Sequence, residues 1–197
     1  MRVISGKLKS RKLLAPKGLN TRPTLDNIKE TIFNIISPIK CDAKVLDLFS
    51  GTGQIGIEFY SRGAKDIYLV DTSFEAISVI KKNLENLAIS DKINLIKIDA
   101  IRALKGPLSK IKFDYIFLDP PYKRQDILNE ALKIILEKNL LKDDASIIIE
   151  ENKDYKIDEC LIDENTFDVD IRSIGDKKIF FIKRFRWKQF IQVVLIL

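Results

Sequence analysis

Short apolar segments alternate with amphipathic segments along most of the chain. Apolar runs typical of buried strands occur at residues 44–49, 66–71, 93–98, 113–118 and 145–150. Apolar positions at helical spacing precede or separate them, at Ile28 to Ile36, in the segment that ends near Arg62-Gly63, at Phe74 to Leu87, and at residues 126–138. Strands that alternate with helices predict an α/β fold with a parallel sheet.

Polar residues next to the helical segments predict where two of the helices begin. Thr24 is expected to be the N-cap of the first helix, whose apolar face is Ile28, Ile32, Ile35 and Ile36 and which Pro38 ends. Thr72 and Glu75 have the spacing of a capping box for the helix whose apolar stripe is Phe74, Ile77, Ile80, Leu84 and Leu87.

The two ends of the chain differ from this pattern. Residues 167–172 and 178–184 flank Gly175-Asp176, which predicts an antiparallel hairpin at the edge of the sheet. Residues 3–20 form short β-like pieces, which predict a basic hairpin or extended arm with little core. We therefore expect one domain over residues 1–197: a basic arm (1–24), a catalytic core (25–186) and an apolar tail (187–197) without an assigned role.

Composition narrows the chemistry. The 197 residues are 46% hydrophobic and include no histidine, which excludes histidine-based catalysis. Cys41 and Cys160 are far apart in sequence, so no zinc or iron site is expected and no metal is assigned. No window holds 18 consecutive apolar residues, and the first residues lack the pattern of a secretory signal, so we expect a cytoplasmic protein.

The net charge of +6 is concentrated near the start of the chain. Residues 1–25 contain no acid and seven bases, which are Arg2, Lys7, Lys9, Arg11, Lys12, Lys17 and Arg22. A basic arm on a folded body is typical of a protein that binds RNA or DNA, and these seven residues are the candidate RNA contacts. The alternative is a solvated strand face in a lysine-rich chain.

A glycine-rich loop follows the first strand of the core. The sequence Gly51-Thr52-Gly53-Gln54-Ile55-Gly56 matches G-x-G-x-x-G, and Asp71 lies twenty residues after Gly51. Glycines allow close approach of the backbone to a ligand, and an acid after the second strand can accept hydrogen bonds from two ribose hydroxyls. The loop therefore predicts a nucleoside cofactor, either NAD or S-adenosylmethionine, with a purely structural turn as the alternative.

Three features favour S-adenosylmethionine. Asp47, in the first strand, suits a cationic amino-acid ligand better than a pyrophosphate, which it would repel. The chain has neither a Tyr-x-x-x-Lys motif nor a histidine, which are usual proton donors of nicotinamide dehydrogenases. The fourth strand ends in Asp119-Pro120-Pro121-Tyr122.

This tetrapeptide suits methyl transfer to the amino group of a base. Asp119 can accept a hydrogen bond from the amine, and the stiff Pro120-Pro121 segment can direct the carbonyl of Pro120 at the same nitrogen. Tyr122 offers a flat face on which a flipped base can stack. The alternative is a Pro-Pro turn with a surface tyrosine.

The carboxyl ends of neighbouring strands gather the remaining candidates. Asp47, Gly51, Asp71, Asp99 and Asp119 are expected to converge at one edge of the sheet. Asp99 is expected either to accept a hydrogen bond from the adenine amino group or to cap a helix. Glu150 and Glu151 end the fifth strand, and we expect them to be mostly solvated.

Four segments resemble a known family, the bacterial RsmD-type 16S ribosomal RNA guanine-N2 methyltransferases. They are Arg2-Val3-Ile4-Ser5-Gly6-Lys7, Asn20-Thr21-Arg22-Pro23-Thr24, Val45 to Gly53, and Asp114 to Tyr122. The resemblance extends over nearly the whole chain, and its most specific part is the basic arm with Thr-Arg-Pro-Thr. Two departures are Thr24-Leu25-Asp26-Asn27, where the family usually has Thr-Thr-Asp-Arg, and the apolar tail.

The resemblance implies a class I methyltransferase (Rossmann-like) fold with a seven-stranded, mostly parallel sheet, an antiparallel edge hairpin, helices on both faces and a basic N-terminal arm. It implies S-adenosylmethionine as methyl donor and the exocyclic N2 of a guanine in 16S rRNA, guanine 966, as acceptor. The expected partner is the small ribosomal subunit or its assembly intermediate, and a monomer is expected. DNA amino-methylation, at adenine N6 or cytosine N4, and a non-catalytic RNA-binding assembly factor are the alternatives.

The expected site has two sets of residues. The catalytic set is Asp119, Pro120, Pro121 and Tyr122. The cofactor-binding set is Asp47, Phe49, Ser50, Gly51, Thr52, Gly53, Asp71, Thr72, Asp99, Ala100 and Asp119, to which the resemblance adds Arg22 and Thr24.

Overall fold

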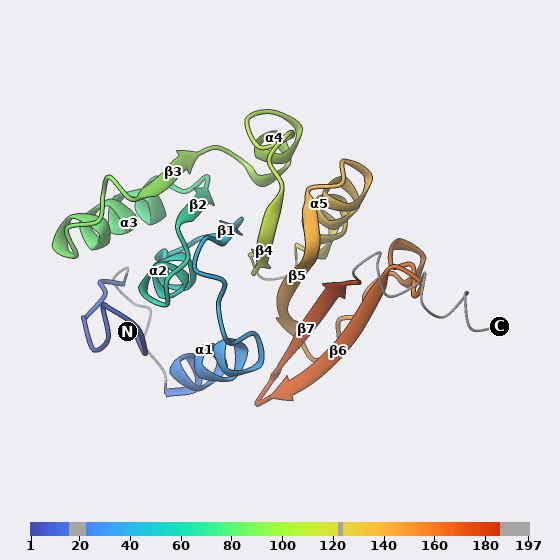
Figure 1. Ribbon diagram of the computed structural model, residues 1–197, viewed down its shortest axis with the longest axis horizontal. Coiled ribbons are helices and arrows are strands. Elements are labelled where there is room, and N and C mark those ends of the chain that lie inside the picture. The colour runs from blue at the N-terminus through green and yellow to red at the C-terminus, as the bar shows by residue number, and fades with distance from the viewer. Residues whose placement is uncertain (16–22, 122–123, 186–197) are drawn as a thin grey trace.

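The computed structural model describes residues 1–15, 23–121 and 124–185, and within them seven strands form one sheet (Figure 1). The strand order is β3-β2-β1-β4-β5-β7-β6, and β7 alone runs antiparallel to its two neighbours, β5 and β6. The bounds are β1 Lys44–Asp47, β2 Asp66–Asp71, β3 Ile93–Lys97, β4 Phe113–Leu118, β5 Leu141–Asn152, β6 Phe167–Ile174 and β7 Lys177–Arg184. The predicted parallel sheet and its antiparallel edge hairpin are confirmed.

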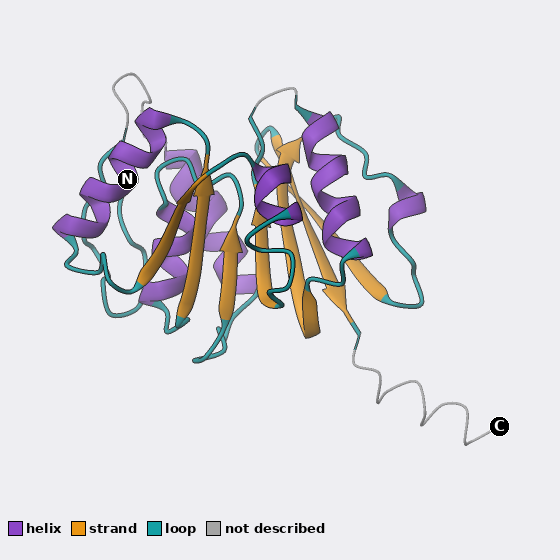
Figure 2. Cartoon of the chain, turned by 90° about the horizontal axis from the view of Figure 1, so that it is seen from above, coloured by secondary structure: helices purple, strands orange, loops and turns teal. Residues whose placement is uncertain are grey.

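Helices cover both faces of this sheet (Figure 2). They are α1 Pro23–Ile35, α2 Gln54–Ser61, α3 Phe74–Asn86, α4 Ala100–Lys105 and α5 Gln125–Glu137, with a short 3₁₀ turn at Glu159–Leu161. Apolar side chains of α1, α2 and α3 share one buried cluster, and those of α4 and α5 share a second. All six residues of β4 are buried, because a central parallel strand is covered on both faces.

Several local expectations were wrong. Helix α1 begins at Pro23, so Thr24 lies inside the helix and is not its N-cap. The N-cap of α3 is Ser73, whose hydroxyl accepts a hydrogen bond from Ala76 N at 3.3 Å, so the proposed Thr72–Glu75 capping box does not form. Strand β5 begins at Leu141, four residues before the expected start, because an irregularity in its pairing with β4 accommodates the polar residues there.

Two apolar positions of the expected helical faces are exposed. Ile35 is 40% exposed, whereas Lys29 and Phe33 of the same helix are buried. Phe74, the first residue of α3, is 76% exposed, and Lys97 Nζ lies 4.9 Å from the centre of its ring. Ile35 lies in the last turn of α1 and Phe74 is the first residue of α3, so helical spacing alone does not determine burial at the ends of these helices.

The N-terminal arm is a hairpin, as expected. The expectation that it contributes little to the hydrophobic core was wrong. Arg2 and Lys12 form an antiparallel bridge, and Val3 N donates to Arg11 O at 3.0 Å. Val3 is 1% exposed and Leu13 is 6% exposed, and both belong to the cluster built by α1, α2 and α3. The arm is therefore part of the packed body.

Buried charges fix the arm to α2. Glu58, which is fully buried, accepts hydrogen bonds from Ile4 N at 2.8 Å and Ser5 N at 3.0 Å. Its carboxylate also lies 2.9 Å from Arg62 Nε and 3.4 Å from Lys29 Nζ. The carboxylate thus satisfies two backbone donors of the arm and neutralises two cations of the body.

None of the helices in residues 1–15, 23–121 and 124–185 is long and apolar enough to cross a membrane. The expected apolar tail, residues 187–197, lies outside the described residues.

Candidate active site

The glycine-rich loop joins β1 to α2 and needs its glycines for different reasons. Gly51 has φ 53° and Gly53 has φ 76°, a left-handed conformation that side chains disfavour. A Cβ on Gly53 would lie 3.2 Å from Leu69 Cδ1, whereas one on Gly51 would meet no atom within 4 Å. A Cβ on Gly56 would lie 2.2 Å from Leu69 Cδ2, so this glycine allows α2 to pack on β2. The loop backbone is therefore open on the side of Gly51.

Asp71, at the end of β2, closes the other side of this opening. Its Oδ2 accepts a hydrogen bond from Gly51 N at 2.8 Å, and its Oδ1 accepts one from Ser73 N at 2.8 Å. Each carboxylate oxygen has a second lone pair. The carboxylate is thus fixed in direction and still able to accept from two hydroxyl groups.

Asp47 is the last residue of β1, before the glycine-rich loop, and Gln54 is the first residue of α2. Asp47 is 1% exposed and accepts a hydrogen bond from Gly56 N at 3.1 Å. Burial, and to a lesser degree the charge of Asp71, raise the pKa of Asp47 to about 7. Gln54 Oε1 is buried and finds no hydrogen-bond partner in the described part of the chain. Among the described residues, Asp47 has no cationic partner and Gln54 Oε1 has no donor, and both groups fit a ligand that carries an ammonium group.

Ser50 and Thr52 of the same loop make contacts within the fold. The hydroxyl of Ser50 donates to Asp47 O at 2.6 Å and accepts from Val70 N at 2.8 Å, which ties the loop to β1 and β2. The hydroxyl of Thr52 lies 3.4 Å from Met1 Sδ, and the side chains of Ser50 and Thr52 are buried.

The other residues expected around a cofactor follow β1, β2 and β3. Phe49 is half-buried, Thr72 is exposed and Ala100 is buried. Asp99 caps α4: its Oδ1 accepts from Arg102 N at 2.9 Å, and its Oδ2 lies 3.2 Å from Arg102 Nε. Of the two roles expected for Asp99, this geometry matches the cap of a helix. Arg22 lies outside the described residues, and of Thr24 only its backbone, in α1, is described.

Asp119 follows β4 at the same edge of the sheet. Its side chain is half-buried, Pro120 is buried and Pro121 is exposed. Burial and the nearby charge of Glu150 raise the pKa of Asp119 well above its usual range, and the charge of Lys177 opposes this rise. Tyr122 lies outside the described residues. Asp47 and Asp71 are the last residues of β1 and β2, and Asp99 and Asp119 come just after β3 and β4, so all four lie at the carboxyl ends of parallel strands, as the sequence predicts.

The expectation that Glu150 and Glu151 are solvated was wrong. Glu150 is 7% exposed and Glu151 is 5% exposed, because β5 continues to Asn152 and pairs there with β7. Glu150 Oε1 lies 3.4 Å from Lys177 Nζ, and Glu151 Oε2 accepts a hydrogen bond from Asn152 N at 2.8 Å. Burial raises the pKa of Glu150 against the opposing charge of Lys177.

Five of the seven bases expected to contact RNA are described. Lys7 Nζ lies 3.4 Å from the centre of the Tyr60 ring, and Arg11 Nη2 donates to Asn86 O at 3.2 Å. Arg2, Lys9 and Lys12 are exposed. Lys17 and Arg22 lie outside the described residues.

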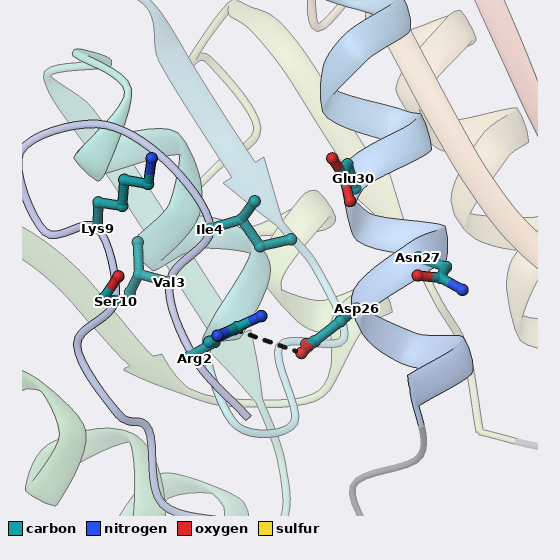
Figure 3. Close-up of a pocket in the computed structure, with 8 residues that line it drawn as sticks. All are labelled: Arg2, Val3, Ile4, Lys9, Ser10, Asp26, Asn27 and Glu30. Carbon is teal, nitrogen blue, oxygen red and sulfur yellow. Dashed lines mark ion pairs between the residues drawn. The ribbon is translucent and has the colours of Figure 1, made fainter.

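A cavity of about 210 Å³ separates the arm from α1 (Figure 3). One wall consists of arm residues, among them Arg2 and Lys9, and the opposite wall carries Asp26, Asn27 and Glu30 of α1. Arg2 Nε lies 3.9 Å from Asp26 Oδ2 across the opening. The basic surface of the arm is thus partly balanced by acids on its inner side.

Metal ligands and cysteines add nothing to this site. The described ranges contain no group of three histidine, cysteine, aspartate or glutamate side chains that could hold a metal ion. Cys41 and Cys160 are both exposed and are not joined in a disulfide.

Several known proteins, and several solved structures, resemble the chain over most of its length. The YlbH protein of Bacillus subtilis is 42% identical over 164 residues, which cover 83% of this chain and 89% of that protein. The ribosomal RNA small subunit methyltransferase D of Haemophilus influenzae is 35% identical over 155 residues, 78% of this chain and 80% of that protein. The solved structure of the Escherichia coli YhhF protein, at 26% identity, superimposes with a TM-score of 0.79 and covers 94% of this chain and 98% of that one.

A more distant structure shares the fold. The Thermus thermophilus 16S rRNA N2 G1207 methyltransferase RsmC, solved with AdoMet and guanosine, is 20% identical, with a TM-score of 0.68 over 85% of this chain and 44% of that one. The family model described as Conserved hypothetical protein 95 matches residues 1–183. The chain therefore belongs to this family, that of the RsmD-type ribosomal RNA methyltransferases.

Proposed function

We propose that this chain transfers a methyl group from S-adenosylmethionine to the exocyclic N2 of a guanine in 16S rRNA, at position 966 by family resemblance. The observation that carries the proposal is the placement of two motifs on neighbouring strands. The glycine-rich loop with Asp71 and the Asp119-Pro120 segment follow β1, β2 and β4, which are adjacent in the sheet. A nucleoside cofactor and an amino acceptor would therefore meet at one edge.

The cofactor half is assigned by its chemistry. Asp71 would accept hydrogen bonds from the two ribose hydroxyls, and the open backbone at Gly51 would lie against the cofactor. Asp47 and Gln54 would face its amino-acid part. The methyl group on the sulfonium is already activated when the cofactor is bound, and we propose that no metal takes part. The remaining candidates are proposed to line the same half: Arg22, Thr24, Phe49, Ser50, Thr52, Gly53, Thr72, Asp99 and Ala100.

Asp119 and Pro120 position the amine. The N2 lone pair of guanine is delocalised into the ring, so transfer requires the nitrogen to be held in line with the methyl group. Asp119 would accept one N2–H, and the carbonyl of Pro120 would accept the other. The carbonyl of Pro121 accepts a hydrogen bond from Arg124 N at 3.0 Å, which turns the chain into α5 after the motif. Tyr122 is proposed to stack on the flipped base.

The arm is assigned to RNA. Arg2, Lys7, Lys9, Arg11 and Lys12 lie on a hairpin that is rigidly joined to α2, and Lys17 and Arg22 follow it in the sequence. Contacts of this kind go to phosphates, so the affinity for RNA should fall as salt rises. With a ribosomal substrate the protein is proposed to act in the cytoplasm, as a monomer on the small subunit or its assembly intermediate.

The proposal is tested with labelled S-adenosylmethionine and small subunits from cells that lack the protein. The RNA is digested and the methylated nucleoside identified; N2-methylguanosine is expected. Label only in adenine or in DNA would identify a DNA amino-methyltransferase, and no label in either would identify an RNA-binding assembly factor. Asp119→Ala should abolish transfer while calorimetry still detects S-adenosylhomocysteine binding; an active Asp119→Ala protein would refute the assigned mechanism.

A further inference from the structure

Four charged side chains share one face of the sheet at its carboxyl edge. Val45, Phe117, Ile148 and Ile179 belong to the buried cluster on the α1 side of β1, β4, β5 and β7. Side chains two positions apart in a strand share a face. The residues two positions along from these four, which are Asp47, Asp119, Glu150 and Lys177, therefore lie in a row over adjacent strands.

This row extends the proposed site away from the cofactor. Asp47 accepts a hydrogen bond from Gly56 N of the glycine-rich loop, so the cofactor half of the proposed site ends at β1. Asp119, on the next strand, is the proposed acceptor for the amine. Glu150 and Lys177 come next in strand order, on the side opposite the cofactor. The region beyond the reacting amine is where the rest of the base must lie.

The pair at this position is unusual for a packed edge. Glu150 is 7% exposed, its Oε1 lies 3.4 Å from Lys177 Nζ, and the Lys177 side chain is 27% exposed. Burial of a carboxylate removes its hydration, and an ion pair with one partly exposed lysine compensates for only part of the resulting loss of free energy. The lysine holds the carboxylate in place, and the charges of both side chains act on Asp119.

The order acceptor, acceptor, donor complements the base proposed as substrate. Along its Watson–Crick edge, guanine presents N2–H, N1–H and O6, which are donor, donor and acceptor. Resting on the proposed function, we propose that Glu150 and Lys177 select guanine, with Glu150 accepting from N1–H and Lys177 donating to O6, while Asp119 accepts from N2–H. Lys177 is at the same time the positioning residue for Glu150.

The same pair disfavours adenine. Adenine places the N1 lone pair where Glu150 has its carboxylate, and its N6 amino group where Lys177 has its ammonium. Both contacts are repulsive and leave charged groups without partners, which discriminates more strongly than the loss of a favourable contact alone.

The test compares two bases that both carry a 2-amino group. Small-subunit RNA is assembled by ligation with guanosine or 2,6-diaminopurine riboside at the target position and reconstituted with its proteins. The analogue has an N1 lone pair and a 6-amino group. We expect kcat/KM of the wild-type protein to be roughly tenfold to a hundredfold higher for guanosine than for the analogue. A difference of this size corresponds to the loss of one or two charge-assisted hydrogen bonds.

Glu150→Gln should lower kcat/KM for guanosine roughly tenfold or more and reduce the preference for guanosine over the analogue, because the glutamine amide can donate to N1. Glu151→Gln is the matched control: it is the same substitution at a buried neighbour on the other face of β5, and both rates should stay within about twofold of wild type. If Glu150→Gln lowers both rates equally, or leaves the preference unchanged, the pair does not select the base and the inference is wrong.

The design separates this inference from the proposed function. A wild-type protein that makes no N2-methylguanosine refutes both, whereas a wild-type protein that makes it with an unchanged preference in the variants refutes only the role of the pair. Lys177→Met repeats the test if Glu150→Gln no longer binds S-adenosylhomocysteine by calorimetry. It should also reduce the preference, because the donor to O6 is lost.

Discussion

Replacing Glu58 by glutamine should cost the protein a large part of its stability. Glu58 is fully buried, and Lys29, its partner at 3.4 Å, is 1% exposed. Lys29 Nζ also donates to Arg2 O at 2.6 Å, and burial lowers the pKa of Lys29 against the charge of Glu58. The glutamine would keep one acceptor oxygen for the arm but leave this lysine without its buried counter-charge.

The magnitude follows from the burial of both partners. Removal of one member of a buried ion pair costs about 3–5 kcal/mol, because the other charge remains desolvated and unpaired. For a chain of this size about 1 kcal/mol corresponds to roughly 2–4 °C in Tm, so the variant should melt about 10 °C below the wild type. The exposed pair of Lys133 and Glu137, at 3.8 Å, is the control, and Lys133→Met should change stability by less than about 1 kcal/mol.

Urea unfolding followed by circular dichroism measures this free energy. Adding Lys29→Met to Glu58→Gln removes the more deeply buried of the two cations that Glu58 neutralises and keeps an apolar stem of similar length, so the double variant should recover part of the loss. A loss below about 1 kcal/mol in Glu58→Gln, or a double variant destabilised by the full sum of both changes, would refute the view that this pair fixes the arm.

Three further predictions concern the arm and the cofactor half. Gly6 has φ 81° and its Cβ would lie 1.9 Å from a carbonyl oxygen of α2, so Gly6→Ala should accelerate proteolysis of the arm, and it should do so more than Gly63→Ala, which shares the backbone strain of a positive φ but meets no atom within 4 Å. Calorimetry should show that Asp71→Ala no longer binds S-adenosylhomocysteine; unchanged binding would remove Asp71 from the site. The raised pKa of Asp47 means that folding favours its protonated form, so its contribution is present below about pH 4 and lost as the pH rises to about 7. It amounts to at most about 4 kcal/mol, and urea unfolding should show this fall in the wild type relative to Asp47→Asn.

The order of strands and helices could be predicted because the sheet is buried on both faces. A strand in that position is buried at every residue, and β4 is apolar at all of them except Asp114, so it stands out from the amphipathic helices. The start of β5 could not be predicted, because Lys142, Asp143 and Asp144 interrupt the apolar run. There Lys142 Nζ lies 2.6 Å from the buried carboxylate of Asp114 on β4, a partner that no local pattern reveals.

The candidate site divides in the same way. The positions of the glycine-rich loop and of Asp71 could be predicted, because they depend on spacing within one β-α-β unit. The burial of Glu150 could not, since it depends on β7, which returns to the sheet almost thirty residues later and brings Lys177 beside it. Glu58 and Lys29 were missed for a related reason: a charged residue on a helix is normally solvated, and here a segment from the start of the chain covers both.

Asn83 of α3 joins the arm to the glycine-rich loop. It is 1% exposed; its Oδ1 accepts from Leu14 N at 2.7 Å, and its Nδ2 donates to Leu14 O at 3.2 Å and Thr52 O at 3.1 Å. The arm is therefore hydrogen-bonded to the same side chain that supports the glycine-rich loop, while Glu58 binds it to the helix that this loop opens. A basic segment held in this way has a fixed position relative to the loop, which a flexible tail of equal charge would not. In the proposed function, the arm would thus supply both positive charge and a defined orientation of bound RNA toward Asp119.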